Sequence, residues 1–158
     1  MARYKPLTDV RYLVVHCAAT PADMDIGVKE IRMWHLQRGF FDIGYHAVIR
    51  RDGTIENGRE LDRPGAHVAG LNNVSLGVCL VGGCKRGEGG ALVTDNNFTP
   101  EQFDSLKGVL RTWLSMWPNA KIVGHRDLAV DPRTHQRLKD CPSFDVKEWL
   151  EANPIIHN

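Results

Sequence analysis

The 158-residue sequence lacks a hydrophobic run long enough to cross a membrane, and no apolar leader follows its first residues, Met1 to Pro6. A membrane helix needs about 20 mostly apolar residues, and a secretory signal needs a basic start followed by a shorter apolar core. We therefore expect a chain that is made in a cytoplasm, carries no signal peptide and does not insert into a membrane.

The sequence also lacks an excess of charge of one sign. It has 20 lysines and arginines against 19 aspartates and glutamates, for a formal net charge of +1. A nucleic-acid-binding protein usually carries a basic stripe or a strongly basic composition, so we expect no nucleic-acid partner. Hydrophobic residues make up 42% and charged residues 25%, as in ordinary globular proteins. We expect one domain spanning residues 1–158, and a monomer.

Cysteine is scarce and irregularly spaced: Cys17, Cys79, Cys84 and Cys141 form no Cys-x-x-Cys pair. A closed structural zinc site normally uses four ligands in such local pairs, and a cytoplasmic chain of this size does not need disulfides. A cysteine with a function here is therefore expected to be a metal ligand or a nucleophile. Cys79, and Cys17 by strand alternation from His16, are expected to be core residues instead.

The pattern of apolar residues predicts strands and helices in loose alternation. Residues 12–17 and 75–82 are apolar runs typical of buried strands, and Asp52-Gly53 is typical of a hairpin turn. A helix is predicted over about 27–38, and a longer one begins after Thr99 with proline and a capping-box glutamine. A short strand over 121–124 and a last helix capped by Asp145 follow. The fold class is therefore predicted as α/β, with a mixed central β-sheet flanked by helices.

His16 and His125 share one context, because each lies at the carboxyl end of a predicted strand. Ligands of open α/β sheets bind at such ends. Two imidazoles and the thiolate of Cys141 would suit Zn²⁺ and leave a fourth position open, as in catalytic zinc sites. On spacing alone, however, either histidine is as well explained by packing.

Several sequence blocks occur in an order that resembles the zinc N-acetylmuramoyl-L-alanine amidases. The blocks are Val14-Val15-His16-Cys17, Asp42-Ile43-Gly44-Tyr45-His46, Leu76 to Gly83, Val123-Gly124-His125 and Lys139-Asp140-Cys141-Pro142-Ser143-Phe144-Asp145. The likeness covers about residues 11–149 and is strongest to the amidase-type lysozymes (endolysins) of phages, which are related to peptidoglycan recognition proteins. It implies one Zn²⁺ ion and cleavage of the amide between the lactyl group of N-acetylmuramic acid and L-alanine in peptidoglycan.

The resemblance also implies roles for individual residues. The metal ligands of the family fall on His16, His125 and Cys141, and its catalytic residues fall on Tyr45 and Lys139. An ammonium such as that of Lys139 could stabilise the oxyanion that forms, and a phenol with a reference pKa of about 10 would donate a hydrogen bond.

Further histidines and one carboxylate have weaker assignments. His46 and His67 resemble histidines that contact the wall substrate or support a ligand. Asp127 could orient a ligand, although an exposed loop carboxylate is the commoner outcome. His35, His135 and His157 are expected to be structural or solvated.

Two other functions remain open at this stage. Cys141 could be the nucleophile of a cysteine hydrolase with His125 as its base, which would leave His16 without a role. The chain could also bind peptidoglycan without cutting it, although relatives of that kind have typically lost the cysteine. Contact with a phage RNA polymerase, known for one phage relative, could coexist with either activity.

The expected biological role follows from the compartment. An amidase without an export signal reaches the wall only after another protein has permeabilised the membrane, or else processes imported wall fragments. The resemblance to phage enzymes favours a bacteriolytic endolysin.

Overall fold

The computed structural model describes residues 6–131, 133–134 and 140–155. Along these residues the chain forms, in order, β1 (Tyr12–Cys17), α1 (Val28–Gln37), β2 (Ala47–Ile49), β3 (Ile55–Asn57), η1 (Asn72–Val74), β4 (Ser75–Leu80), β5 (Cys84–Arg86), η2 (Glu88–Gly90), β6 (Leu92–Thr94), α2 (Pro100–Met116), β7 (Lys121–Gly124), α3 (His125–Leu128) and α4 (Val146–Ala152). In this part of the chain no helix is long and apolar enough to cross a bilayer.

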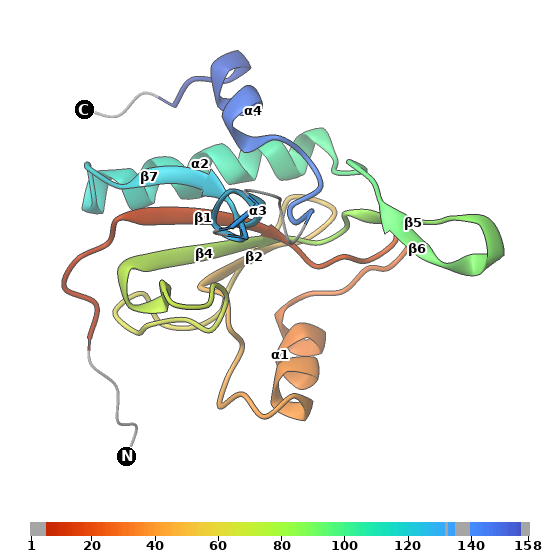
Figure 1. Ribbon diagram of the computed structural model, residues 1–158, viewed down its shortest axis with the longest axis horizontal. Helices are drawn as coiled ribbons and strands as arrows, with labels where there is room; N and C mark the ends of the chain where they lie inside the picture. The colour runs from red at the N-terminus through yellow and green to blue at the C-terminus, as the bar shows by residue number, and fades with distance from the viewer. Residues whose placement is uncertain (1–5, 132, 135–139, 156–158) are drawn as a thin grey trace.

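Five strands form one mixed sheet in the order β3-β2-β4-β1-β7 (Figure 1). β1 lies between β4 and β7 and is parallel to both, with Val14 opposite Gly77 on one side and Val123 on the other. β2 is parallel to β4, whereas β3 is antiparallel to β2. The carboxyl ends of β1, β4 and β7 therefore meet at one edge, which is where the predicted ligands lie.

Helices cover both faces of this sheet, as Figure 1 shows, with α2 on one face and α1 on the other. Leu13 and Val15 of β1 pack with Leu106 and Leu110 of α2, and all four are fully buried. On the α1 side, Val48 and Cys79 belong to a smaller cluster that includes Ile31 and Ile43. Side chains of β1 and β4 thus alternate between two cores, so these two strands are buried on both faces.

The N-terminus of α2 is held by the predicted capping box. Thr99 Oγ1 accepts a bond from the Gln102 backbone at 3.1 Å, and Gln102 Oε1 accepts one from the Thr99 backbone at 3.0 Å. Gln102 is fully buried, and its amide also donates to the carbonyl oxygens of Ile49 and Val81. One side chain therefore joins α2 to β2 and to the end of β4.

Most of the predicted elements are confirmed, and the structure adds several short ones. The glycine-rich stretch after β4 contains the antiparallel pair β5 and β6, which projects from the end of the sheet (Figure 1). One helical turn, α3, begins at His125. Asp145 caps α4 as predicted, accepting from the Glu148 backbone at 3.1 Å.

Candidate metal centre and active site

The three predicted metal ligands lie together. His16 is the fifth residue of β1, His125 directly follows β7, and Cys141 lies in the loop before α4. Potential ligand atoms of the three side chains all lie within 4.8 Å of one another. Adjacent parallel strands β1 and β7 bring the two histidines together, since their carboxyl ends share one edge of the sheet.

The donor set and its spacing fit Zn²⁺. Tetrahedral zinc with bonds of about 2.0 Å to nitrogen and about 2.3 Å to sulfur separates those atoms by roughly 3.6 Å. His16 Nδ1 and Cys141 Sγ are 3.9 Å apart. Two imidazoles and a thiol are the ligand types that zinc prefers, and three of them leave one position for water or substrate.

A side-chain cap fixes the turn that carries His125, and a backbone hydrogen bond joins that turn to the segment of Cys141. The Gly124 N–H donates to Asp127 Oδ2 at 2.8 Å, and the Arg126 N–H donates to the Cys141 carbonyl at 2.7 Å. A side chain at Gly124 would not fit, because a Cβ there would lie 2.9 Å from Pro142 Cδ. Asp127 is therefore not a free loop carboxylate; it caps the helical turn that begins at the candidate ligand His125.

Cys17 contributes to the site, which the sequence did not reveal. Its backbone N–H donates to Cys141 Sγ at 3.1 Å, and its own thiol lies 3.8 Å from Ser143 Oγ. The predicted burial of Cys17 is confirmed, but β1 ends at this residue, and the loop of Cys141 passes across the strand end. Cys141 therefore reaches both His16 and Cys17, although the two alternate along the strand.

The thiols of Cys17 and Cys141 influence each other's pKa. The hydrogen bond with Cys141 lowers the pKa of Cys17 to about 7, against the opposing effect of burial, and the same contact raises the pKa of Cys141. The backbone N–H of Cys17 favours negative charge on Cys141, because a charged acceptor strengthens that bond. Without a metal these pKa shifts favour deprotonation of Cys17, whereas a cation held by His16 and His125 would favour the thiolate on Cys141.

A cavity of about 790 Å³ opens beside the three ligands. Tyr45 and His67 line it, together with Arg38 and Phe40 from the end of α1 and the loop beyond. Tyr45 is half-buried, and its ring centroid is 5.0 Å from that of His16. Burial raises the pKa of Tyr45 well above its usual value, and the nearby Cys79 thiol adds to this. The phenol therefore remains protonated at neutral pH and can donate a hydrogen bond.

The two further predicted histidines have different surroundings. His46 is 2% exposed, and both of its ring nitrogens bond to backbone: Nδ1 accepts from Gly77, and Nε2 donates to the Arg63 carbonyl. This arrangement favours a structural role for His46 over contact with substrate. His67 lines the cavity, and its Nδ1 lies 2.8 Å from Nε2 of His16, so it contacts a ligand directly.

The remaining residues that the sequence analysis named either lie outside the described part of the chain or have a structural role. Lys139, the predicted catalytic lysine, lies outside the described residues, as do His135 and His157. His35 is buried and accepts a bond from the Gly44 N–H at 2.9 Å, so its expected structural role is confirmed, although it also lines the cavity.

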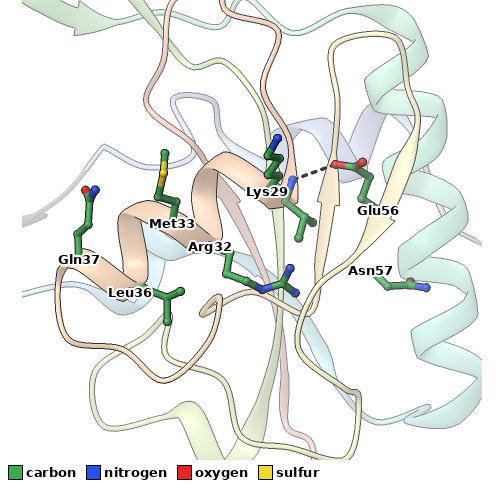
Figure 2. A pocket seen from close by; sticks show the side chains of 8 residues that line it. Lys29, Arg32, Met33, Leu36, Gln37, Glu56 and Asn57 are labelled. Carbon is green, nitrogen blue, oxygen red and sulfur yellow. Dashed lines mark hydrogen bonds between the residues drawn. The ribbon is translucent and has the colours of Figure 1, made fainter.

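A second hollow of about 830 Å³ lies over α1 and β3, as Figure 2 shows. Met33 and Leu36 of α1 line it and are about half exposed. The dashed line in Figure 2 is the bond from the Val28 N–H to Glu56 Oε1, at 2.9 Å. None of the three candidate ligands lines this hollow, so the chemistry is assigned to the cavity beside His16.

Comparison with known proteins gives consistent matches along most of the chain. Residues 6–144 match the family described as N-acetylmuramoyl-L-alanine amidase. The endolysin of Enterobacteria phage K11 is 47% identical over 143 residues, covering 90% of this chain and 86% of the relative. The endolysin of Escherichia phage T7 is 42% identical over 159 residues, covering 99% and 97%.

A solved structure agrees with the sequence matches. The N-acetylmuramoyl-L-alanine amidase LysC from Clostridium intestinale superposes with a TM-score of 0.71 at 26% identity, covering 96% of this chain and 93% of that one. The predicted fold class, a mixed sheet flanked by helices, is confirmed by this neighbour and by the sheet itself. The chain therefore belongs to the N-acetylmuramoyl-L-alanine amidase family.

Proposed function

We propose that this protein is a phage endolysin that hydrolyses the amide between the lactyl group of N-acetylmuramic acid and L-alanine in peptidoglycan, with Zn²⁺ held by His16, His125 and Cys141. The observation that carries the proposal is the convergence of these three side chains, within 4.8 Å, beside an open cavity. Family membership and the endolysin relatives support the reaction class and the wall substrate.

Zinc bound there would supply a Lewis acid that polarises the amide carbonyl and lowers the pKa of a bound water from about 15.7 toward about 7. The protein's own contribution begins with the ligands, which must present two neutral imidazoles and one thiolate. The Cys17 N–H assists by donating to Cys141 Sγ at 3.1 Å.

Two residues are proposed to act on the substrate directly. Tyr45 lines the cavity and keeps its proton; its hydroxyl contacts the Cys79 thiol in this structure and is proposed to donate instead to an oxygen of the reacting amide when substrate is bound. Lys139 stabilises the negative charge that forms on the carbonyl oxygen; this role rests on the resemblance to the family. Removing one such donor typically lowers the rate by about 10²–10³-fold.

The test is to incubate the protein with purified peptidoglycan and to identify the new chain ends by mass spectrometry. We expect new L-alanine amino termini with intact muramic acid, lost with a chelator and restored by Zn²⁺. His16→Ala, His125→Ala and Cys141→Ala should lose both zinc and activity, whereas Tyr45→Phe and Lys139→Ala should retain zinc and lose rate.

Three other results would contradict the proposed function and indicate a different one. Activity that resists chelation but is lost after thiol alkylation would indicate a cysteine nucleophile at Cys141. Binding to peptidoglycan without any new ends would indicate a non-catalytic module. New reducing sugars would indicate cleavage of the glycan, and with it a wrong assignment of the site.

A further inference from the structure

Behind His16, on the side away from Cys141, three buried side chains are joined in a row. His16 Nε2 lies 2.8 Å from His67 Nδ1, and His67 Nε2 lies 3.2 Å from Ser75 Oγ. His16 is 1% exposed, His67 8% and Ser75 0%. Ser75 is the first residue of β4, and His67 links it to one of the candidate ligands.

The donor and acceptor roles along the row are fixed from its far end. Ser75 Oγ lies 2.8 Å from the Leu71 carbonyl, which can only accept, so the hydroxyl proton points there. Ser75 Oγ therefore accepts from N–H at His67 Nε2. A neutral imidazole has one donor and one acceptor, so His67 Nδ1 accepts the proton of His16 Nε2–H.

The direction of these hydrogen bonds determines which nitrogen of His16 can bind a metal. With the proton on Nε2, the lone pair of His16 is on Nδ1, the nitrogen that lies 3.9 Å from Cys141 Sγ. If each hydrogen bond in the row ran in the opposite direction, the proton of His16 would be on Nδ1, and that nitrogen could not bind a metal.

Packing holds His67 in place for this role. Asn72 Oδ1 accepts from the backbone N–H groups of His67 and Val68, both at 2.9 Å. The His67 ring lies against Gly77 of β4, where a Cβ would be 2.7 Å from His67 Nδ1. The ring thus has little room to turn, and a larger residue at position 77 would displace it.

We propose that Ser75 and His67 are positioning residues that hold His16 as the Nε2–H tautomer, with Nδ1 directed to the metal. The proposal rests on the proposed zinc site, which it extends by two residues. Partners of this kind typically change metal affinity or activity by about 10–100-fold when they are removed.

The first test measures the tautomer without any metal. In the full-length chain with ¹⁵N-labelled histidine, freed of metal at neutral pH, two-bond ¹H–¹⁵N spectra report which ring nitrogen carries the proton. We expect the Nε2–H form for both His16 and His67. Ser75→Ala removes the acceptor and should give His67, and with it His16, a mixture of tautomers. Ser75→Thr retains the hydroxyl and should restore the wild-type pattern.

The second test measures zinc affinity by competition with a chromophoric chelator. Ser75→Ala should bind Zn²⁺ about 10–100-fold more weakly, and Ser75→Thr close to wild type. Val78→Ala is the matched control, because Val78 is equally buried in β4 but packs in the α2 core. It should lower stability without changing the tautomers or the zinc affinity.

The outcomes separate this proposal from the proposed function. His16 as the Nδ1–H tautomer in the wild type would overturn the row as assigned, even if no variant folds. Wild-type zinc affinity and tautomers in Ser75→Ala would overturn the role of Ser75. A wild-type chain that shows the expected tautomers but binds no zinc would instead refute the zinc site while leaving the row of hydrogen bonds intact.

Discussion

Acid should destabilise this protein in part through His46, and replacing that residue should reduce the effect. Burial lowers the pKa of His46 from 6.5 to about 4, opposed in part by the bond to the Arg63 carbonyl. Protonation at Nδ1 would also turn an acceptor into a donor facing the Gly77 N–H, 3.0 Å away. The folded protein therefore holds His46 neutral at pH values where the unfolded chain would protonate it.

The magnitude follows from the two pKa values. Because the folded pKa is below the unfolded one, the stabilising contribution is complete above pH 6.5 and is lost as pH falls toward about 4. Between pH 7 and pH 5 the unfolded state gains most of one proton that the folded state does not. This corresponds to about 2 kcal/mol of unfolding free energy from His46 alone. His67, whose pKa is also lowered by burial, adds to the loss in the same direction.

The assay is urea unfolding at pH 7, 6 and 5 for wild type and His46→Gln, with a chelator present so that pH-dependent metal binding does not contribute. The variant should be less stable at pH 7 but should lose about 2 kcal/mol less than wild type on going to pH 5, which corresponds to a difference of roughly 1 M in the shift of the urea midpoint. Equal losses in both proteins, or an NMR titration of His46 near pH 6.5, would refute the reasoning.

Three further predictions concern packing and can be checked on the same preparations. Gln102→Ala removes the buried amide that donates to the Ile49 and Val81 carbonyls and accepts from the Thr99 backbone, and because each carbonyl keeps one other donor, it should lower the unfolding free energy by roughly 1–3 kcal/mol. Leu110→Ala opens a cavity in the fully buried α2 core and should lower the unfolding free energy by roughly 2–5 kcal/mol. Leu92→Ala, at a half-exposed position, should change it by less than about 0.5 kcal/mol. Comparable losses of unfolding free energy in the two variants would contradict the assigned core. Gly77→Ala should displace His67 and weaken zinc binding in the chelator competition, whereas Gly108→Ala, with nothing within 4 Å of the added Cβ, should not.

Local sequence signals predicted the main elements because their physical causes are local. The run of β-branched and apolar residues over 12–17 is buried on both faces and forms β1, an interior strand of the sheet. Thr99 and Gln102 satisfy the first backbone groups of α2 from within the same four residues. Asp52-Gly53 forms the predicted turn, with Gly53 at a φ of +90° that other residues rarely adopt.

What the sequence could not predict depends on contacts between distant segments. Cys17 was expected to be only a core residue, since nothing nearby shows that the loop of Cys141, 124 residues later, crosses the end of its strand. A serine at the start of a strand does not by itself predict a role, so the role proposed for Ser75 follows only from its contact with His67 in the folded structure. β5 and β6 are exposed strands of three residues separated by glycines, which leave no alternation long enough to identify.

During synthesis, β1 leaves the ribosome before β4 and β7, the two strands with which it pairs. Its partners in the sheet, β4 and β7, end at Leu80 and Gly124, so β1 has no complete pairing until about a hundred more residues are made. At about 5–20 residues per second this delay is roughly 5–20 s. The apolar run Leu13–Val15, fully buried in the finished protein, is exposed for that time. The nascent chain is therefore most prone to aggregation, and most dependent on chaperones, before β7 emerges.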